Sequence, residues 1–139
     1  MRRGENPIKN KNGKVLLKKH RVIMVFYAPG RSEGEFFENL ELVLDKSIES
    51  LIKTVNHDIT NITLINNSSS SKAELIVKKY SEYIDKYVCY NTNKGKVNAV
   101  LNEARSVYEE FVTITDADIL FYSGWEHETF KLFKDFKNV

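Results

Sequence analysis

Apolar side chains gather in four short runs along the chain, and between the runs they recur at helical spacing. Each run has four to six residues, many of them β-branched or aromatic, which is typical of strands buried on both faces. The runs lie at 22–27, 61–65, 87–90 and 111–115. A segment with Pro, Gly, Asn or Ser follows each of the first three, and such residues end strands. The pattern therefore predicts four strands.

The segments between these runs carry apolar residues three or four positions apart, which places them on one face of a helix. The first such face extends from Phe37 to Leu51, the second from Ala73 to Ile84 and the third from Val97 to Tyr108. Strands that alternate with helices through short connections form a parallel sheet with right-handed crossovers. We therefore expect an α/β fold with a mainly parallel sheet and helices on both faces.

Most of the unusual polar residues lie in the segments that follow the four predicted strands, at 28–30, 66–69, 91–95 and 116–118. In open α/β sheets the ligand lies beyond the carboxyl ends of the strands. Because these four segments meet at that edge of a parallel sheet, the sequence predicts one ligand site there.

Asp116 and Asp118 come directly after the fourth run. Two side chains at positions i and i+2 of an extended chain point the same way. Together they can hold a hard divalent cation, since Mg²⁺ commonly takes one or two carboxylates plus substrate phosphates. The alternative is a solvated turn with two structural aspartates, and the position at a strand end favours the cation.

Two more of these segments carry groups that suit a nucleotide. Asn66 and Asn67 can hydrogen-bond a base edge or ribose hydroxyls, although a serine-rich loop that caps the next helix is an equal alternative. Lys96 opens the third helix, where free N–H groups and lysines suit a diphosphate, and a glycine turn with solvated lysines is the alternative. The chain has neither a P-loop nor a G-x-G-x-x-G motif, which argues against a dinucleotide-binding fold.

Composition and charge narrow the class of protein. The 139 residues are 42% apolar and 29% charged, which suits one globular domain or part of one, without a membrane span or secretory signal. Residues 1–21 hold eight Lys or Arg and one acidic residue, whereas the remainder is mildly acidic. We therefore predict a basic, flexible leader over 1–20, a domain over 21–139 and no nucleic-acid partner.

The Cys, His and Trp positions say less about function. Cys89 is the single cysteine, and its apolar run predicts a buried structural thiol in a reducing compartment. His20, His57 and His127 lack metal-ligand spacing, which predicts surface or packing roles. Trp125 is suited both to stacking on a sugar and to anchoring a following helix, and the sequence leaves both open.

Five segments follow one another in the order of a known pattern. They are 21–27 (a first strand), 47–51 ("S-x-x-S-L"), 62–69 ("V-V-D-N-G-S"), 93–102 ("N-x-G-x-x-x-A-x-N") and 112–118 (a DxD strand). Gly124 and Trp125 occupy the place of a frequent P-x-W step. In this order the segments resemble the nucleotide-binding half of family 2 glycosyltransferases, which have the GT-A fold. The resemblance covers about residues 21–135 and implies a Rossmann-like half-domain.

The resemblance implies roles for the residues that would hold a nucleotide sugar. Tyr27 would lie near the base, and Asn67, with Asn66 beside it, would replace the acidic residue that pairs with uracil. Lys96 would face the diphosphate. Asn66 and Asn67 depart from the family's acidic pair, and Ala28 stands where the family usually has Asn. The donor is therefore left open between a UDP-sugar and a GDP-sugar.

The resemblance also implies a metal and a reaction. Asp118 would bind Mn²⁺ or Mg²⁺ directly, and Asp116 would contact the ribose or the metal shell. The sugar would pass, with inversion, to a hydroxyl of a saccharide or lipid-linked acceptor. An inverting transferase needs a general base, which in the family lies in the half after the DxD motif. We therefore expect the chain to be the front half of a larger domain, with the base beyond Val139.

Two other functions share these features. A donor domain that holds a nucleotide or a partner without turnover is one of them. A nucleotidyltransferase is the other, although its Gly- and Arg-rich phosphate loop is poorly matched by 28–32. We expect a cytoplasmic protein whose basic leader is suited to peripheral contact with the inner face of a membrane. The sequence does not indicate an oligomeric state.

Overall fold

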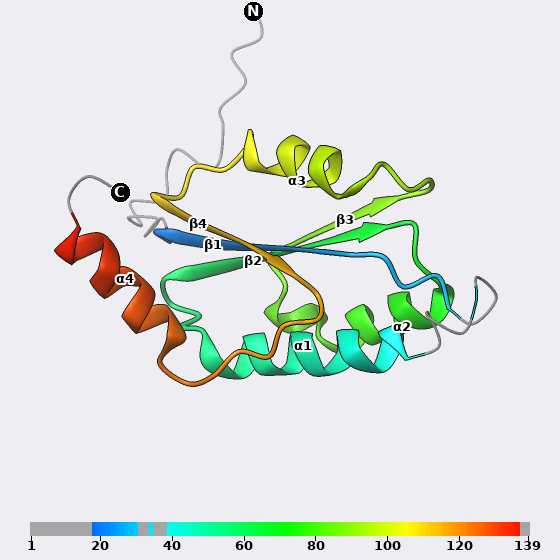
Figure 1. The fold of residues 1–139 in the computed structure, drawn as a ribbon, viewed down its shortest axis with the longest axis horizontal. Helices are drawn as coiled ribbons and strands as arrows, with labels where there is room; N and C mark the ends of the chain where they lie inside the picture. Colours follow the sequence, from blue (N-terminus) through cyan, green and yellow to red (C-terminus); the bar gives the residue numbers. More distant parts are fainter. Residues whose placement is uncertain (1–17, 31–33, 35–38, 137–139) are drawn as a thin grey trace, which may run out of the picture.

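A four-stranded parallel sheet forms the centre of the protein. The computed structural model describes residues 18–30, 34 and 39–136. The strands in these ranges are β1 (His20–Phe26), β2 (Thr60–Asn67), β3 (Lys86–Tyr90) and β4 (Phe111–Asp116). Their order across the sheet is β3-β2-β1-β4, and every pair is parallel (Figure 1). The predicted α/β fold is confirmed. Most of the predicted leader lies outside the described residues.

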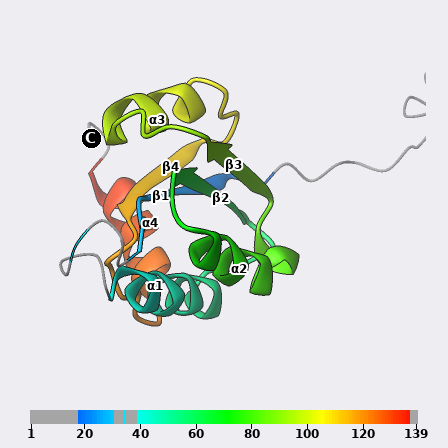
Figure 2. The same cartoon turned by 90° about the vertical axis from the view of Figure 1, so that its right-hand side faces the viewer.

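Helices cover both faces of this sheet, as predicted. In the described ranges they are α1 (Leu40–Thr54), α2 (Ser71–Lys79), α3 (Lys96–Ala104) and α4 (Trp125–Asp135), with a 3₁₀ turn, η4 (Ser81–Tyr83), after α2. Figure 2 shows α1, α2 and α4 on one face and α3 on the other. Over these described ranges, no helix combines the length and the apolar character needed to cross a bilayer.

Side chains of the central strand β1 alternate between the two faces, and both faces are buried. Val22, Met24 and Phe26 belong to a cluster with α1 and α2, whereas Ile23 and Val25 belong to a smaller cluster with α3. All five residues are at most 6% exposed. This explains the continuous apolar run, because a strand covered on both sides has no polar face.

The second and third helices end earlier than apolar spacing predicts. The spacing extends the second helix to Ile84, but α2 ends at Lys79, and Ile84 reaches the core from beyond η4. The third helix is predicted to reach Tyr108, whereas α3 ends earlier and Tyr108 is 94% exposed. Phe37, the predicted start of the first helix, lies outside the described residues. Apolar spacing continues through turns and loops, so it overestimates helix length.

The prediction that Cys89 is buried is wrong. Cys89 is exposed because β3 is an edge strand of the sheet. Beside it, a cavity of about 490 Å³ is lined in part by Val77, Ile84 and Tyr87. The short helix α2 leaves this part of β3 uncovered. A four-residue apolar run does not show which strand will form an edge.

A buried polar network joins α4 to the amino ends of the strands. His20 Nδ1 lies 2.8 Å from Glu126 Oε1, and His20 Nε2 lies 2.9 Å from Thr113 Oγ1. The Thr60 hydroxyl donates to the same carboxylate, whose other oxygen accepts the backbone N–H of Asn56 at 2.8 Å. The side chains of His20 and Glu126 are 2% and 8% exposed. His20 thus has the packing role that the sequence predicts.

Trp125 anchors the start of α4 against α1. Its Nε1 donates to Thr54 Oγ1 at 3.1 Å, and its ring packs on Phe121 with centroids 5.0 Å apart. The His20 ring lies 6.0 Å away, which places Trp125 beside the buried network just described. The structure therefore favours the anchoring alternative for Trp125.

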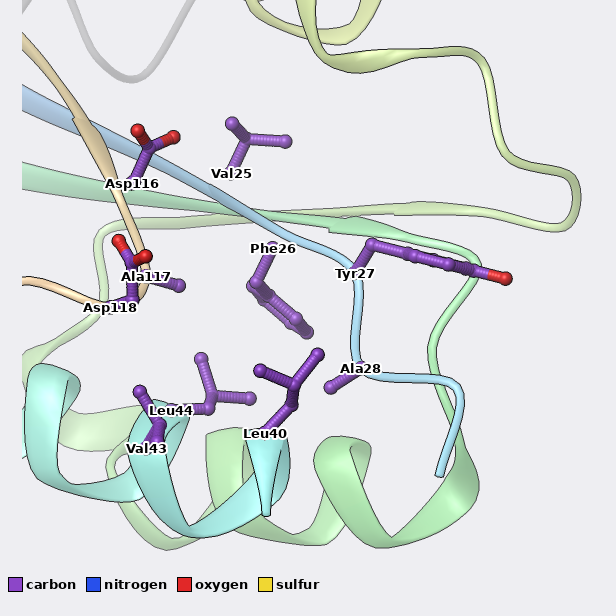
Figure 3. A pocket seen from close by; sticks show the side chains of 10 residues that line it. All are labelled: Val25, Phe26, Tyr27, Ala28, Leu40, Val43, Leu44, Asp116, Ala117 and Asp118. Carbon is purple, nitrogen blue, oxygen red and sulfur yellow. The ribbon is translucent and has the colours of Figure 1, made fainter. Parts of the chain in front are cut away.

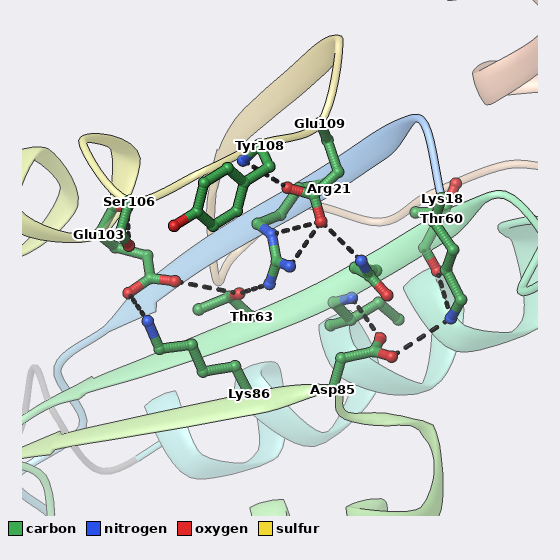
Figure 4. Close-up of polar contacts among 12 residues, drawn as sticks. Lys18, Arg21, Thr60, Thr63, Asp85, Lys86, Glu103, Ser106, Tyr108 and Glu109 are labelled. Atoms are coloured by element: carbon green, nitrogen blue, oxygen red, sulfur yellow. Dashed lines mark hydrogen bonds and ion pairs between the residues drawn. The ribbon is translucent and has the colours of Figure 1, made fainter. Parts of the chain in front are cut away.

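A second polar network lies on the sheet face that carries α3 (Figure 4). Arg21 donates to Glu109 Oε1 from Nε at 3.0 Å and from Nη2 at 2.5 Å, and Asn61 donates to the same oxygen at 2.6 Å. Thr63 links Arg21 to Glu103. Burial raises the pKa of Glu109, but the hydrogen bonds from Arg21 and Asn61 outweigh it and bring this pKa to about 2. The amino-terminal part of this face is therefore held by charged side chains.

Candidate functional site

Two adjoining cavities open at the carboxyl ends of the strands. The α1-side cavity has a volume of about 260 Å³, and the α3-side cavity has a volume of about 330 Å³. The first is lined by Val25, Phe26, Tyr27, Ala28, Leu40, Val43, Leu44, Asp116, Ala117 and Asp118 (Figure 3). The second is lined by Val25, Phe26, Tyr27, Asn67, Asn93, Gly95, Lys96 and Asp116. The cavities share the wall formed by the ends of β1 and β4.

Asp116 and Asp118 stand at the end of β4. Asp116 is the last residue of the strand and lies opposite Val25 of β1 in the parallel register. Asp118 follows two residues later and is exposed. Figure 3 shows the two carboxylates on the same side of the chain, as the i and i+2 spacing predicts. Among the described residues, no hydrogen bond or ion pair engages the Asp118 carboxylate.

These two aspartates fit a divalent cation that a bound ligand also coordinates. Both supply hard oxygen donors, which Mg²⁺ and similar ions prefer. No group of three or more His, Cys, Asp or Glu side chains suited to a metal occurs in the described part of the chain. The described residues would therefore supply two carboxylates to the cation, and oxygens of the bound ligand or of water would have to complete its coordination.

Lys96 faces this acidic pair from α3. Its ammonium forms an ion pair with the Asp116 carboxylate, and the two side chains are 56% and 48% exposed. Lys96 is the first residue of α3, directly after Gly95, which has a φ of 75°. Among the described residues no side chain caps this helix end, so its first N–H groups remain available to an anion. A positive helix start therefore lies beside the two aspartates.

Asn67 holds the loop that leads into α3. Its side chain donates to Asn93 Oδ1 and accepts the backbone N–H of Lys94, both at 2.8 Å. Asn93 Oδ1 also accepts the N–H of Gly95 at 2.8 Å. Asn67 is 3% exposed, and its hydrogen bonds to the loop position one wall of the α3-side cavity. Asn93 is a site residue that the sequence reasoning did not single out, although Asn-Lys-Gly after a strand was its signal.

Comparison with known proteins identifies the family. Residues 36–139, more than half of the chain, match the family model Glycosyl transferase family 2. The chain belongs to glycosyl transferase family 2. This confirms the resemblance inferred from the five sequence segments.

Similar proteins include longer members of the family. The minor teichoic acid biosynthesis protein GgaB of Bacillus subtilis (strain 168) is 29% identical over an alignment of 103 residues, and the match covers 72% of this chain and 11% of GgaB. Residues 1–349 of TarS from S. aureus share 18% identity with a TM-score of 0.67, over 84% of this chain and 32% of TarS 1–349. The chain thus spans about a tenth of GgaB and about a third of that TarS structure.

Two solved structures with similar folds contain nucleotide sugars. TarS 1–349 in complex with UDP-GlcNAc has a TM-score of 0.63 at 20% identity, over 84% of this chain and 31% of that one. The mannosyltransferase PcManGT of Pyrobaculum calidifontis, in complex with GDP-Man and Mn²⁺, has a TM-score of 0.60 at 18% identity, over 76% of this chain and 29% of that one. At these identities the likeness confirms the GT-A fold of this family 2 chain.

The structure brings together five of the six residues that the sequence predicts for the site. These are Tyr27, Asn67, Lys96, Asp116 and Asp118, and each lines one or both cavities. Asn66 lines neither cavity and is fully buried. Its amide donates to the Tyr87 hydroxyl at 2.9 Å, and its carbonyl accepts the N–H of Ser69 at 2.7 Å. Asn66 shapes the loop after β2.

The loops after β1 and β2 are tied to each other, which fixes the position of Tyr27. The backbone N–H of Ala28 donates to Ser69 Oγ, and the N–H of Ser70 donates to the Ala28 carbonyl, both at 2.9 Å. Ser70 also donates to Glu41 at 2.5 Å, and Glu41 pairs with Lys72 at 2.8 Å. Hydrogen bonding from Lys72 lowers the pKa of Glu41. These contacts hold Ala28, which lines the α1-side cavity beside Tyr27.

Proposed function

We propose that this family 2 chain is the donor-binding part of a glycosyltransferase that takes a nucleoside-diphosphate sugar and a divalent cation. The observation that carries this proposal is the arrangement of Asp116, Asp118 and Lys96 around two adjoining cavities at the carboxyl ends of the strands. It is supported by the nucleotide sugars bound to TarS and PcManGT, and by the Mn²⁺ bound to PcManGT.

Each residue of the site has a proposed part in holding the donor. Asp118 and Asp116 hold Mn²⁺ or Mg²⁺, which when bound neutralises charge on the leaving diphosphate. Lys96 and the uncapped start of α3 bind the phosphates. Tyr27 lies beside the base, and Asn67 positions the wall that the base contacts. Asn66 contributes through the loop after β2, because its side chain is already engaged.

The general base of an inverting reaction is proposed to come from outside the described residues. Three acidic residues follow Asp118 in the chain, and Glu126 is engaged in the buried network with His20. The other two, Glu128 and Asp135, belong to α4, which packs at the amino ends of the strands. We propose a saccharide or lipid-linked hydroxyl as the acceptor, and the name of GgaB, a teichoic acid biosynthesis protein, supports that class.

Metal-dependent binding of a nucleoside diphosphate tests this proposal. We expect UDP or GDP with Mn²⁺ to raise the melting temperature of the protein, and the preferred nucleotide identifies the base. Asp118→Ala should lose the Mn²⁺-dependent part of this increase. Asp58→Ala is the matched control, because Asp58 is also an exposed aspartate but lies before β2, at the amino end of the sheet.

The outcomes separate the parts of the proposal. If neither nucleotide stabilises the wild-type protein with Mn²⁺, the proposed donor site is wrong. An unchanged Mn²⁺-dependent increase in Asp118→Ala would contradict the metal assignment alone. Release of free sugar or of nucleoside diphosphate from a labelled donor distinguishes a transferase from a module that only binds.

A further inference from the structure

The two aspartates at the end of β4 are in different electrostatic states. The Asp116 carboxylate is paired with the Lys96 ammonium, whereas Asp118 has no ion-pair partner among the described residues. A cation that approaches this pair without a nucleotide therefore meets one free carboxylate and one that a positive charge already neutralises. The arrangement weakens the site for a cation alone.

The backbone of Lys96 has a defined position, whereas its side chain is exposed and can rotate. The preceding loop is held by Asn67 and Asn93, so the start of α3 has a defined position. The Lys96 side chain is 56% exposed, and a lysine stem has several rotatable bonds. Lys96 lines the α3-side cavity, where phosphates are proposed to bind. A small rotation of the side chain can thus exchange a carboxylate partner for a phosphate.

We propose that Lys96 is an internal counter-ion of Asp116 that makes cation binding depend on the nucleoside diphosphate. This inference rests on the proposed function. Without a nucleotide, Lys96 neutralises Asp116 and holds cation affinity low. When a diphosphate occupies the α3-side cavity, Lys96 turns to the phosphates and leaves Asp116 and Asp118 both free. Because coupling between two ligands is reciprocal, the cation raises nucleotide affinity by the same factor.

Mn²⁺ binding to the protein without nucleotide tests this role directly. Lys96→Met removes the charge and keeps most of the stem, and we expect it to raise the affinity for Mn²⁺ alone roughly three- to tenfold. Lys96→Arg keeps the charge and should retain the weak binding of the wild type. Lys94→Met is the matched control, because Lys94 is exposed and has no ion-pair partner in the described ranges. Free Mn²⁺ is measured by electron paramagnetic resonance.

The same titration with UDP or GDP present measures the coupling. We expect the nucleotide to increase the Mn²⁺ affinity of the wild type and of Lys94→Met. The increase for Lys96→Met should be smaller by roughly three- to tenfold, because the phosphates still supply oxygen ligands but the competing ammonium is absent. If Lys96→Met binds Mn²⁺ alone no better than Lys94→Met, the inference is wrong even where the wild type binds nucleotide with Mn²⁺. If the wild type binds neither nucleotide with Mn²⁺, the proposed function and this inference both fail. Far-ultraviolet circular dichroism confirms that each variant is folded.

Discussion

The two ends of the sheet both carry ion pairs, but the pairs are buried at the amino end and half exposed at the carboxyl end. At the amino end, the Arg21–Glu109 ion pair and the hydrogen-bonded pair of His20 and Glu126 have side chains that are at most 15% exposed. Each of these carboxylates accepts several hydrogen bonds. At the carboxyl end, the paired side chains are about half exposed, and one aspartate is unpaired among the described residues. The polar side chains at the amino end therefore stabilise the fold, whereas the charged side chains at the carboxyl end can exchange partners.

Desolvation explains why the two ends behave differently. Removing one member of a buried pair leaves an uncompensated charge in a poorly solvated place, which costs about 3 to 5 kcal/mol. An exposed pair contributes only about 0 to 1 kcal/mol, because water replaces either partner. Lys96 and Asp116 can thus part at little cost, and Arg21 and Glu109 cannot.

The largest expected effect on stability is at Glu126. Glu126→Ala leaves His20, Thr60 and the backbone N–H of Asn56 without their shared acceptor. We expect the free energy of unfolding to fall by about 3 to 5 kcal/mol, measured by urea denaturation, because each buried polar group left without a partner costs about 1 to 3 kcal/mol. Nucleotide binding per folded molecule should not change, because the network lies at the opposite end of the sheet.

Glu128→Ala is the control for this substitution. Glu128 lies on the same helix, but its side chain is 68% exposed. We expect its substitution to change the free energy of unfolding by less than about 0.5 kcal/mol. Equal effects of the two substitutions would show that the buried network does not hold α4.

The next largest effect depends on pH and involves Glu109. Its pKa in the folded protein is about 2, below the ordinary value of 4.5, so the folded state favours the ionised form. This contribution is complete above about pH 4.5 and is lost as the pH falls toward 2. Glu109→Gln should therefore be less stable than the wild type by about 2 to 3 kcal/mol at pH 7, and the difference should shrink on acidification.

Unfolding measured from about pH 7 down to about pH 2.5, which covers most of the interval between the ordinary and the folded pKa, checks the prediction. Glu110→Gln is the matched control, because Glu110 is the next residue and is exposed. It should keep the pH profile of the wild type. A Glu109→Gln protein whose deficit stays constant from neutral to acidic pH would contradict a role for the ionised carboxylate.

The sequence predicts the fold well because the central strands are buried on both faces. The runs around Val22 and Ile62 are continuous and apolar, so strand type and order along the chain follow from them. Helix ends and the edge position of Cys89 do not follow, because they depend on how far α2 and α3 reach across the sheet. These are tertiary properties that apolar spacing does not encode.

For the site, the sequence predicts which loops meet, but it does not predict which polar atoms remain available. Asn66 and Asn67 look equivalent in the chain, yet one is buried behind the site and the other holds the α3-side wall. The ion pair of Lys96 with Asp116 joins residues on different elements, and only the packing of α3 against the sheet brings them together.

The smallest expected effect on stability is at Asp118, where the effect on function is expected to be large. Asp118 is exposed, and no ion pair of its carboxylate occurs in the part of the chain that the structure describes. Asp118→Ala should therefore change the free energy of unfolding by less than about 0.5 kcal/mol in metal-free buffer, as should Asp58→Ala. Only Asp118→Ala should lose the stabilisation by Mn²⁺ with nucleotide. A loss of more than about 2 kcal/mol in metal-free buffer would show that the carboxyl end, like the amino end, uses its acidic residues to hold the fold.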